Sequence, residues 1–211
     1  MQTEKGQSIE DASMKMIEAE IGNHGYNDKE WPIVRRIIHS TADFDFAGNN
    51  KIIFSQNAIE SGIEALKNGK SIVVDVNGVI GGLNKQNPKD FQNEIICNIS
   101  NPRAMELAKK EGKTRSQISM RMAASYIDGG IVVIGNAPTA LLEVIQMVKE
   151  ELVKPALIIG IPVGFISAPE SKEELAKLTQ VQYITNIGRK GGSSSASAIV
   201  NALYKLLKAE L

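Results

Sequence analysis

The sequence contains very little cysteine and histidine. Cys97 is the only cysteine, and His24 and His39 are the only histidines, in a chain of 211 residues. A single cysteine excludes a disulfide within the chain and is typical of a protein from a reducing compartment. Because a structural zinc site takes four cysteine or histidine ligands, we expect no resident metal.

Aromatic residues and an excess of charge of one sign are also missing. The chain has one tryptophan, four tyrosines and five phenylalanines, and its 24 basic residues balance 24 acidic ones. Proteins that bind a nucleic-acid duplex or a membrane surface usually gather positive charge on one face, and those that bind single strands add aromatic rings. We therefore expect no nucleic-acid or membrane partner. A polyanionic small ligand needs only a local group of donors and remains compatible.

Long hydrophobic segments are absent. The first residues are polar, without the apolar core of a signal peptide. The longest uncharged stretch, residues 155–169, is interrupted by proline and glycine and is shorter than a membrane-spanning helix. We therefore expect a cytoplasmic protein.

The apolar residues that are present indicate the fold. Short β-branched segments alternate with longer helical patterns, which is typical of a parallel sheet with helices on both faces. We expect one domain over residues 1–211, with three layers and a five-stranded sheet that follows two N-terminal helices. The predicted helices cover residues 9–21 and 28–40, and the predicted strands cover residues 71–76, 94–99, 131–134, 155–159 and 183–186.

Several helix starts are readable. Asn101 followed by Pro102 predicts an N-cap and a first helical residue, and Pro138 predicts another start of the same kind. Ser171 with Glu174 three residues later predicts a capping box that opens a helix at Ser171.

A glycine-rich segment, Gly-Arg-Lys-Gly-Gly-Ser-Ser-Ser at residues 188–195, leads from the last predicted strand into the last predicted helix. Free backbone N–H groups at that helix start, together with Arg189 and Lys190, would form an anion site. The alternative is a plain strand-to-helix turn with serine caps, and spacing alone leaves both open. The chain lacks a P-loop, a dinucleotide-binding glycine motif and a nucleophile elbow.

His39 is the candidate for acid–base chemistry. It lies at the end of an amphipathic helical pattern, with Arg36 three residues earlier on the same face. The helix dipole there favours a protonated imidazole, which suits protonation of a substrate beside an arginine that binds its carboxylates. The alternative, which spacing alone favours, is a histidine that caps its own helix.

Three further charged residues are considered. Arg115 lies at a predicted helix start, where its planar guanidinium would bind a carboxylate; the alternative is a solvated surface arginine. Asp43 and Asp45 have the composition of a carboxylate dyad, but residues two apart in a loop need not converge. We interpret both aspartates as ordinary loop residues.

Four segments together resemble the precorrin-8X methylmutase family. They are VRRIIHSTAD (residues 34–43), GNAPTAL (135–141), GIPVGFISAPESKEEL (160–175) and GRKGGSSSASAIVNAL (188–203). They occur in the family's order and spacing, and with SMKMIEAE (13–20) the resemblance covers almost the whole chain. The chain departs from the family pattern at residues 75–82 and in the loop that follows His39.

The resemblance implies a flavodoxin-like, three-layer α/β/α fold and a homodimer whose substrate pockets lie near the subunit interface. It implies a methyl shift from C11 to C12 of a corrinoid ring, a step of cobalamin biosynthesis that consumes no cofactor. The reaction converts precorrin-8X to hydrogenobyrinate, or cobalt-precorrin-8 to cobyrinate. Direct handover of the product to the next pathway enzyme is a further expectation.

The resemblance also assigns residues. The family's catalytic histidine corresponds to His39, which we expect to protonate, or hydrogen-bond to, a ring nitrogen beside the migrating methyl group. The residues that correspond to its substrate contacts are Ser13, Arg36, Arg115, Lys190, Gly191, Gly192 and Ser193. Two alternatives remain: a corrinoid carrier on the same scaffold, and a flavodoxin-like module that binds a phosphate-bearing cofactor through residues 188–195.

Overall fold

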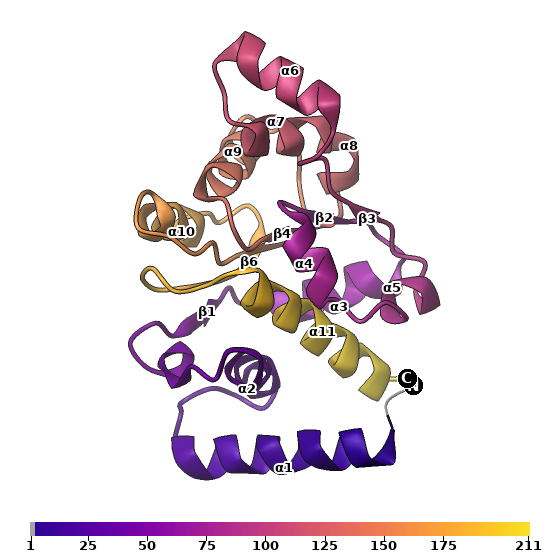
Figure 1. The fold of residues 1–211 in the computed structure, drawn as a ribbon, viewed down its shortest axis with the longest axis vertical. Coiled ribbons are helices and arrows are strands. Elements are labelled where there is room, and N and C mark those ends of the chain that lie inside the picture. The colour runs from indigo at the N-terminus through magenta and orange to yellow at the C-terminus, as the bar shows by residue number, and fades with distance from the viewer. Residues whose placement is uncertain (1–2) are drawn as a thin grey trace.

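A six-stranded mixed sheet lies at the centre of the structure, a computed structural model that describes residues 3–211 (Figure 1). The strand order is β1-β6-β5-β4-β2-β3, in which β1 runs antiparallel to β6 and every other neighbouring pair is parallel. The strands are β1 (Ile52–Phe54), β2 (Ile72–Val74), β3 (Ile95–Ile96), β4 (Ile131–Ile134), β5 (Leu157–Gly160) and β6 (Gln182–Asn186).

The expected number of five strands is wrong, because β1 adds a sixth. This strand has only three residues, and Ile52 pairs with Asn186 at the end of β6. Three residues between polar turns carry too little period-2 signal to be distinguished from a loop. An antiparallel edge strand on an otherwise parallel sheet is a common arrangement.

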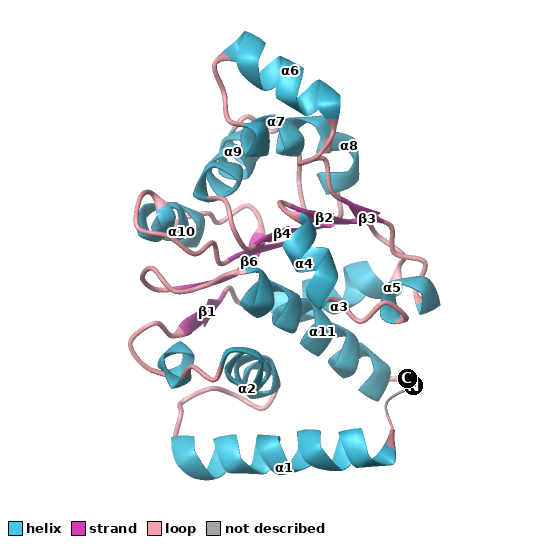
Figure 2. Ribbon diagram, viewed as in Figure 1, coloured by secondary structure: helices cyan, strands magenta, loops and turns pink. Residues whose placement is uncertain are grey.

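Helices cover both faces of the sheet (Figure 2). The described elements are α1 (Glu4–Ile21), α2 (Glu30–Thr41), the 3-10 helix η1 (Phe44–Ala47), α3 (Ala58–Lys67), α4 (Asn77–Gly82), α5 (Asn87–Asp90), α6 (Pro102–Glu111), α7 (Arg115–Met122), α8 (Ala124–Ile127), α9 (Pro138–Lys149), α10 (Ala168–Ala176) and α11 (Ser193–Ala209). None of these helices is long and apolar enough to cross a membrane.

Successive side chains along each strand point to opposite faces of the sheet, so the hydrophobic core is divided between the two faces. Ile72 and Val74 on β2 pack into the cluster formed with α2, α3 and α11, whereas Val73 between them packs with α7–α10. Helix α2 is buried along the stripe Ile33, Val34, Ile37 and Ile38, the spacing of one helical face. In Figure 1 α1 lies beyond α2, as an additional outer layer. The site described below lies on the α2 and α11 side.

Of the three helix starts read from capping signals, two are confirmed and one is wrong, and α1 begins at Glu4, earlier than the predicted residue 9. The Asn101 side chain caps α6 by accepting a hydrogen bond from the Arg103 N–H at 3.0 Å, and α9 begins at Pro138. Helix α10 begins at Ala168 rather than at Ser171. Pro169 suits the first turn of α10, where the missing N–H has no helical partner anyway. Ser171 is buried inside the helix and donates to the Ala168 carbonyl at 2.9 Å.

Candidate functional site

A buried carboxylate organises the carboxyl ends of the central strands. Asp75 follows β2 and is fully buried. It accepts hydrogen bonds from the N–H groups of Gly135 (3.0 Å), Asn136 (2.8 Å) and Ala137 (2.7 Å). Burial raises the pKa of Asp75, and these three donors oppose the rise. Asp75 thereby fixes the turn between β4 and α9, against which α11 begins.

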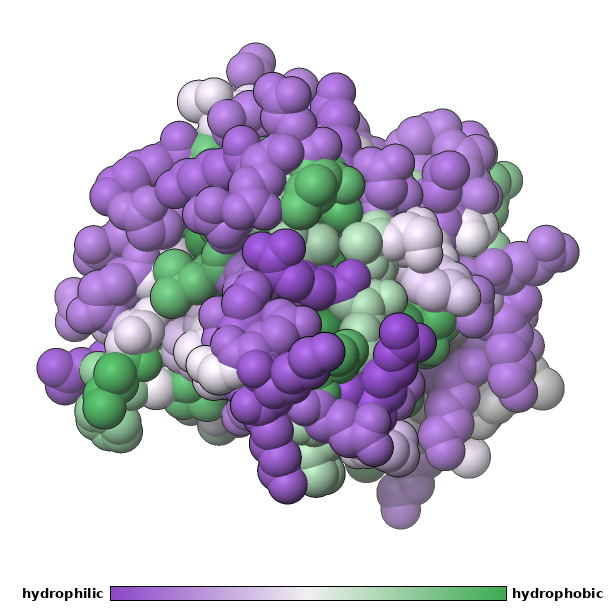
Figure 3. All heavy atoms as spheres, turned by 90° about the horizontal axis from the view of Figure 1, so that it is seen from above, coloured by the Kyte–Doolittle hydropathy of each residue, from purple (hydrophilic) through white to green (hydrophobic). Residues whose placement is uncertain are grey.

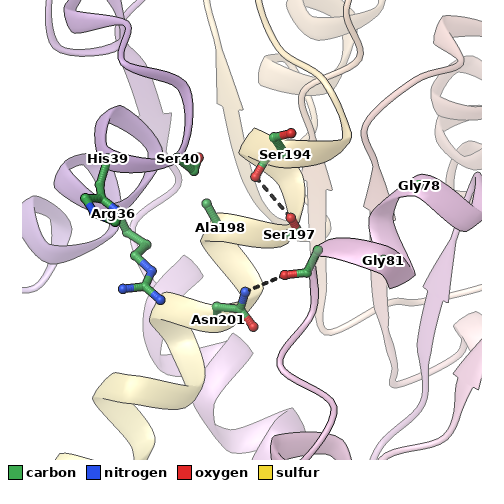
Figure 4. Close-up of a pocket in the computed structure, with 10 residues that line it drawn as sticks. Arg36, His39, Ser40, Gly78, Gly81, Ser194, Ser197, Ala198 and Asn201 are labelled. Atoms are coloured by element: carbon green, nitrogen blue, oxygen red, sulfur yellow. Dashed lines mark hydrogen bonds between the residues drawn. The ribbon is translucent and has the colours of Figure 1, made fainter. Parts of the chain in front are cut away.

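A pocket of about 490 Å³, which we call the His39 pocket, opens between α2, α4 and α11. Figure 4 shows α2 residues on one side and residues of α4 and α11 on the other. The lining residues are Arg36, His39, Ser40, Gly78, Gly81, Gly82, Ser194, Ser197, Ala198 and Asn201.

Glycines let α4 approach α11 closely. A Cβ at Gly82 would lie 2.2 Å from the Ser197 hydroxyl oxygen, and the Gly82 carbonyl accepts from the Asn201 side chain at 2.8 Å. A Cβ at Gly135 would lie 2.9 Å from the Cα of Ser193. The wall opposite His39 is therefore built from glycine contacts that larger residues would push apart.

His39 lies in the last turn of α2, and its side chain is exposed. Within residues 3–211 its imidazole forms no hydrogen bond. The helix end is satisfied by other groups: the Ala42 N–H donates to Ile38, and the Ser40 and Thr41 hydroxyls donate to the Ile37 carbonyl. His39 therefore does not cap its own helix, and its ring nitrogens are available to a ligand.

A second pocket, the α1 pocket, lies on the other side of His39. Its volume is about 290 Å³, and Ser13, Met16, His39 and Phe44 are among the residues that line it. Ser13 donates its hydroxyl proton to the Ile9 carbonyl of its own helix at 2.9 Å. His39 lines both pockets, so a ligand that spans them would contact the imidazole.

Arg36 lines the His39 pocket but already has a partner. Its guanidinium pairs with Glu10 of α1 at 2.5 Å, and Lys205 of α11 lies 3.6 Å from the same carboxylate. The Glu10 side chain is only 13% exposed, so this pair is shielded from water. A ligand carboxylate that binds Arg36 has to compete with Glu10.

Asp43 and Asp45 do converge, contrary to our interpretation of them as ordinary loop residues. Lys190 of the glycine-rich turn donates to Asp43 at 2.8 Å and to Asp45 at 2.7 Å. The hydrogen bonds that Lys190 donates to both carboxylates raise its pKa. The interaction joins segments far apart in sequence, so local spacing gave no signal. It ties the glycine-rich turn to the loop that follows His39.

The glycine-rich turn itself approaches β5 closely. Gly191 has a φ of +157°, and a Cβ there would lie 2.2 Å from the Ile161 carbonyl oxygen. The next residue, Gly192, donates its N–H to the same carbonyl at 3.0 Å. Ser193 then begins α11, and Ser194 lines the His39 pocket.

Arg115 is not brought to His39 within one chain. It is the first residue of α7, where Thr114 and Gln117 form a capping box, and it lines a separate pocket with Met105 and Lys113. Helix α7 packs on the opposite side of the sheet from α2 (Figure 1). Figure 3 looks onto the molecule from that end, where hydrophilic side chains predominate around smaller apolar groups.

Two residues that support the site were missed from the sequence. Asp75 was passed over, although a lone carboxylate directly after a buried strand is a recognisable signal. Lys172 was not singled out, yet it is only 2% exposed and donates to carbonyls of the glycine-rich turn. Nothing in the charged SKEEL segment distinguishes Lys172 from a surface lysine.

Comparisons with known proteins agree with this architecture. The sequence profile of precorrin-8X methylmutase matches residues 8–206. A cobalt-precorrin-8 methylmutase from Priestia megaterium is 51% identical over 95% of this chain and 88% of its own length. Another, from Leptospira interrogans, is 46% identical over 97% and 95%.

A solved structure is also similar. The crystal structure of precorrin-8X methylmutase from Thermus thermophilus superposes with a TM-score of 0.87 at 36% identity, covering 96% of this chain and 98% of its own. Sequence and fold therefore agree over nearly the whole length, and the chain belongs to the precorrin-8X methylmutase family.

Proposed function

We propose that this chain is an isomerase of cobalamin biosynthesis that moves a methyl group from C11 to C12 of a corrinoid ring. Its substrate is precorrin-8X or cobalt-precorrin-8, and its product is hydrogenobyrinate or cobyrinate. Family membership supports the reaction. The observation that carries the catalytic assignment is the exposed, unbonded imidazole of His39 between two pockets.

His39 acts as the acid. The methyl group leaves C11 with its bonding pair and joins C12, so no atom is gained or lost. A proton or hydrogen bond from His39 to the neighbouring ring nitrogen makes the conjugated system electron-poor where the new bond forms. A transferred proton returns to His39 once the methyl group has moved, so the product is an isomer of the substrate. A positioned acid of this kind contributes roughly 10²–10⁴-fold to the rate.

The remaining predicted residues bind the carboxylate-bearing periphery of the macrocycle. Ser13 and Arg36 line the two pockets that share His39. The turn of Lys190, Gly191, Gly192 and Ser193 leads into α11, whose Ser194 lines the His39 pocket. Arg115 lies too far across the sheet to join them in the same chain, so we assign it to the site of the partner subunit in a homodimer.

The proposed enzyme is a single cytoplasmic domain over residues 1–211, in which the five parallel strands form a flavodoxin-like core. No cofactor is needed, because the rearrangement is internal to the substrate. Charge-assisted contacts to several carboxylates would make product release slow, which favours direct handover to the next enzyme.

The test is turnover of precorrin-8X and cobalt-precorrin-8, followed by visible absorbance, for wild type, His39→Ala and His24→Ala. Loss of His39 should lower kcat by about 10²–10⁴-fold while macrocycle binding is retained. His24 stacks on Trp31 at 3.8 Å between ring centroids and lines neither pocket, so it is the matched control.

Three other results would decide against the proposal. Equal turnover by wild type and His39→Ala would assign the proton to another group. Binding without turnover by the wild type would identify a carrier. A copurified yellow, fluorescent flavin with no corrinoid binding would favour the phosphate-cofactor module.

A further inference from the structure

Lys172 of α10 is a buried lysine without a counter-ion. It is 2% exposed, and no carboxylate of residues 3–211 lies within ion-pair distance of its amine. Burial lowers the pKa of Lys172 to about 7. A methionine would fill similar space without the cost of desolvating an amine. The reason for a lysine here must therefore lie in the groups that it binds.

Those groups are carbonyls of the glycine-rich turn. The Lys172 amine donates to the Gly188 oxygen at 3.0 Å and to the Lys190 oxygen at 2.6 Å. The Asn186 side chain donates to the same Lys190 oxygen at 2.9 Å. Figure 1 shows this turn extending between α10 and η1, which matches its two attachments, to Lys172 and through Lys190 to Asp43.

Holding these carbonyls inward directs the neighbouring amides outward. The described peptide bonds are all trans, and in a trans peptide the C=O and N–H point in opposite directions. The N–H groups of Arg189 and Gly191, which share peptide planes with the bound carbonyls, therefore point away from Lys172. Within residues 3–211 neither N–H donates a hydrogen bond.

The start of α11 follows after Gly192, whose own N–H is bound to the Ile161 carbonyl. The first N–H groups of a helix have no helical partner, so Ser193 and its neighbours add donors to the same segment. Successive backbone N–H groups of this kind form an anion-binding concavity. The Lys190 ammonium is occupied by Asp43 and Asp45, and the Gly192 N–H by the Ile161 carbonyl. Within residues 3–211 the Arg189 and Gly191 amides, beside the Arg189 guanidinium, are uncommitted donors of the turn.

When its amine is protonated, Lys172 also strengthens those donors. An ammonium bound to a carbonyl oxygen polarises the peptide group and makes its N–H a better donor, because hydrogen bonds in a chain reinforce one another. Burial leaves this field weakly screened by water. The cation thus acts on the outer side of the turn without reaching it.

We propose that Lys172 is a positioning residue of the substrate site: it holds the Gly188 and Lys190 carbonyls so that the Arg189 and Gly191 amides bind a carboxylate of the corrinoid. The inference deepens the proposed function and rests on it. Lys172 does not touch the substrate, so its removal weakens binding and leaves the methyl shift itself intact.

The test compares Lys172→Met, which keeps shape without donors, and Lys172→Gln, which keeps two N–H donors without charge. With cobalt-precorrin-8, Lys172→Met should raise KM by about tenfold to 100-fold, the loss of a charge-assisted contact, while kcat changes by less than about threefold. Lys172→Gln should recover part of this loss. Lys177→Met is the control, because that lysine lies at the end of the same helix with a 68% exposed side chain.

A second measurement uses the wild-type protein, so it does not depend on whether a variant folds. In wild-type protein labelled with ¹⁵N, addition of cobyrinate should shift the amide signals of Arg189 and Gly191. Unshifted amides, or an unchanged KM in folded Lys172→Met, would overturn the positioning role while the proposed function stands. A wild type that neither binds nor converts the macrocycle would overturn both.

Discussion

Replacing Asp75 with asparagine should destabilise the fold through one turn. The carboxylate Oδ1 accepts from the Gly135 N–H, and Oδ2 accepts from the N–H groups of Asn136 and Ala137. A carboxamide has one acceptor and one donor end. It can keep the two bonds at Oδ2 only by turning its NH₂ group toward the N–H of Gly135, so two buried donors would face each other.

The magnitude follows from these contacts. A hydrogen bond to a charged group contributes about 1.5–3 kcal/mol, and a buried donor left unsatisfied costs about 1–3 kcal/mol. The asparagine no longer carries a desolvated charge, and burial does raise the pKa of Asp75, so part of the loss is recovered. We expect a net loss of roughly 2–4 kcal/mol, which for a chain of this size lowers Tm by about 5–15 °C.

Urea unfolding and thermal melting of wild type and Asp75→Asn measure this effect. Asp128→Asn is the control, because that aspartate is exposed and accepts one N–H, from Lys154 at 2.9 Å. The pKa of Asp75 is higher in the folded than in the unfolded state, so the contribution of Asp75 to the unfolding free energy is greatest below pH 4 and decreases as pH rises. A variant as stable as wild type at pH 7, or more stable, would refute the reasoning.

Three further predictions concern charged groups. Lys190→Met, which removes the partner of Asp43 and Asp45, should raise KM in turnover assays and leave Tm within about 2 °C, since these pairs are solvent-exposed. Burial opposes ionisation of Glu143, but hydrogen bonds from Arg121, Lys113 and Gln117 hold its pKa below the usual value. Glu143→Gln should therefore lower the unfolding free energy by roughly 1–3 kcal/mol in urea unfolding at pH 7, and by less as pH falls toward 3. The amine of Lys172 is charged in the unfolded state up to pH 10.5 but in the folded state only below about 7. The unfolding free energy of wild type relative to Lys172→Met should therefore rise between those two pH values in a series of urea titrations. A difference that does not change with pH would contradict the lowered pKa.

The parts of the fold that were predictable are those with a strong periodic signal. Strand β4 is a run of four buried β-branched residues, and its predicted bounds agree with the structure. The helix start at Pro138 was predictable because proline is favoured at the first position of a helix. Strand β1 and the start of α10 are different, because β1 is held by its pairing with β6 and α10 begins before the serine that resembles a cap.

The contacts of the candidate site likewise include some that sequence spacing predicts and some that it does not. Arg36 and His39 share a pocket because they are three residues apart on one helix, a relation that spacing gives. The pairing of Lys190 with Asp43 and Asp45 joins segments that only the folded chain brings together. Spacing also could not place Arg115 across the sheet, because strand order and helix side depend on the whole topology.

The partners of these charges bear on how an anionic macrocycle binds. Arg36 is paired with Glu10 and Lys190 with two aspartates, so the charge of each cation is already partly neutralised before a ligand carboxylate arrives. A further carboxylate at either cation therefore gains less electrostatic free energy than it would at an unpaired one. Within residues 3–211 the Arg189 and Gly191 amides of the glycine-rich turn have no partner to lose, so the gain in binding falls to them and to apolar contacts in the two pockets. A site of this kind selects the shape of the macrocycle and the position of its carboxylates more than its total charge. Its affinity should therefore change less with salt than that of a site lined by unpaired arginines.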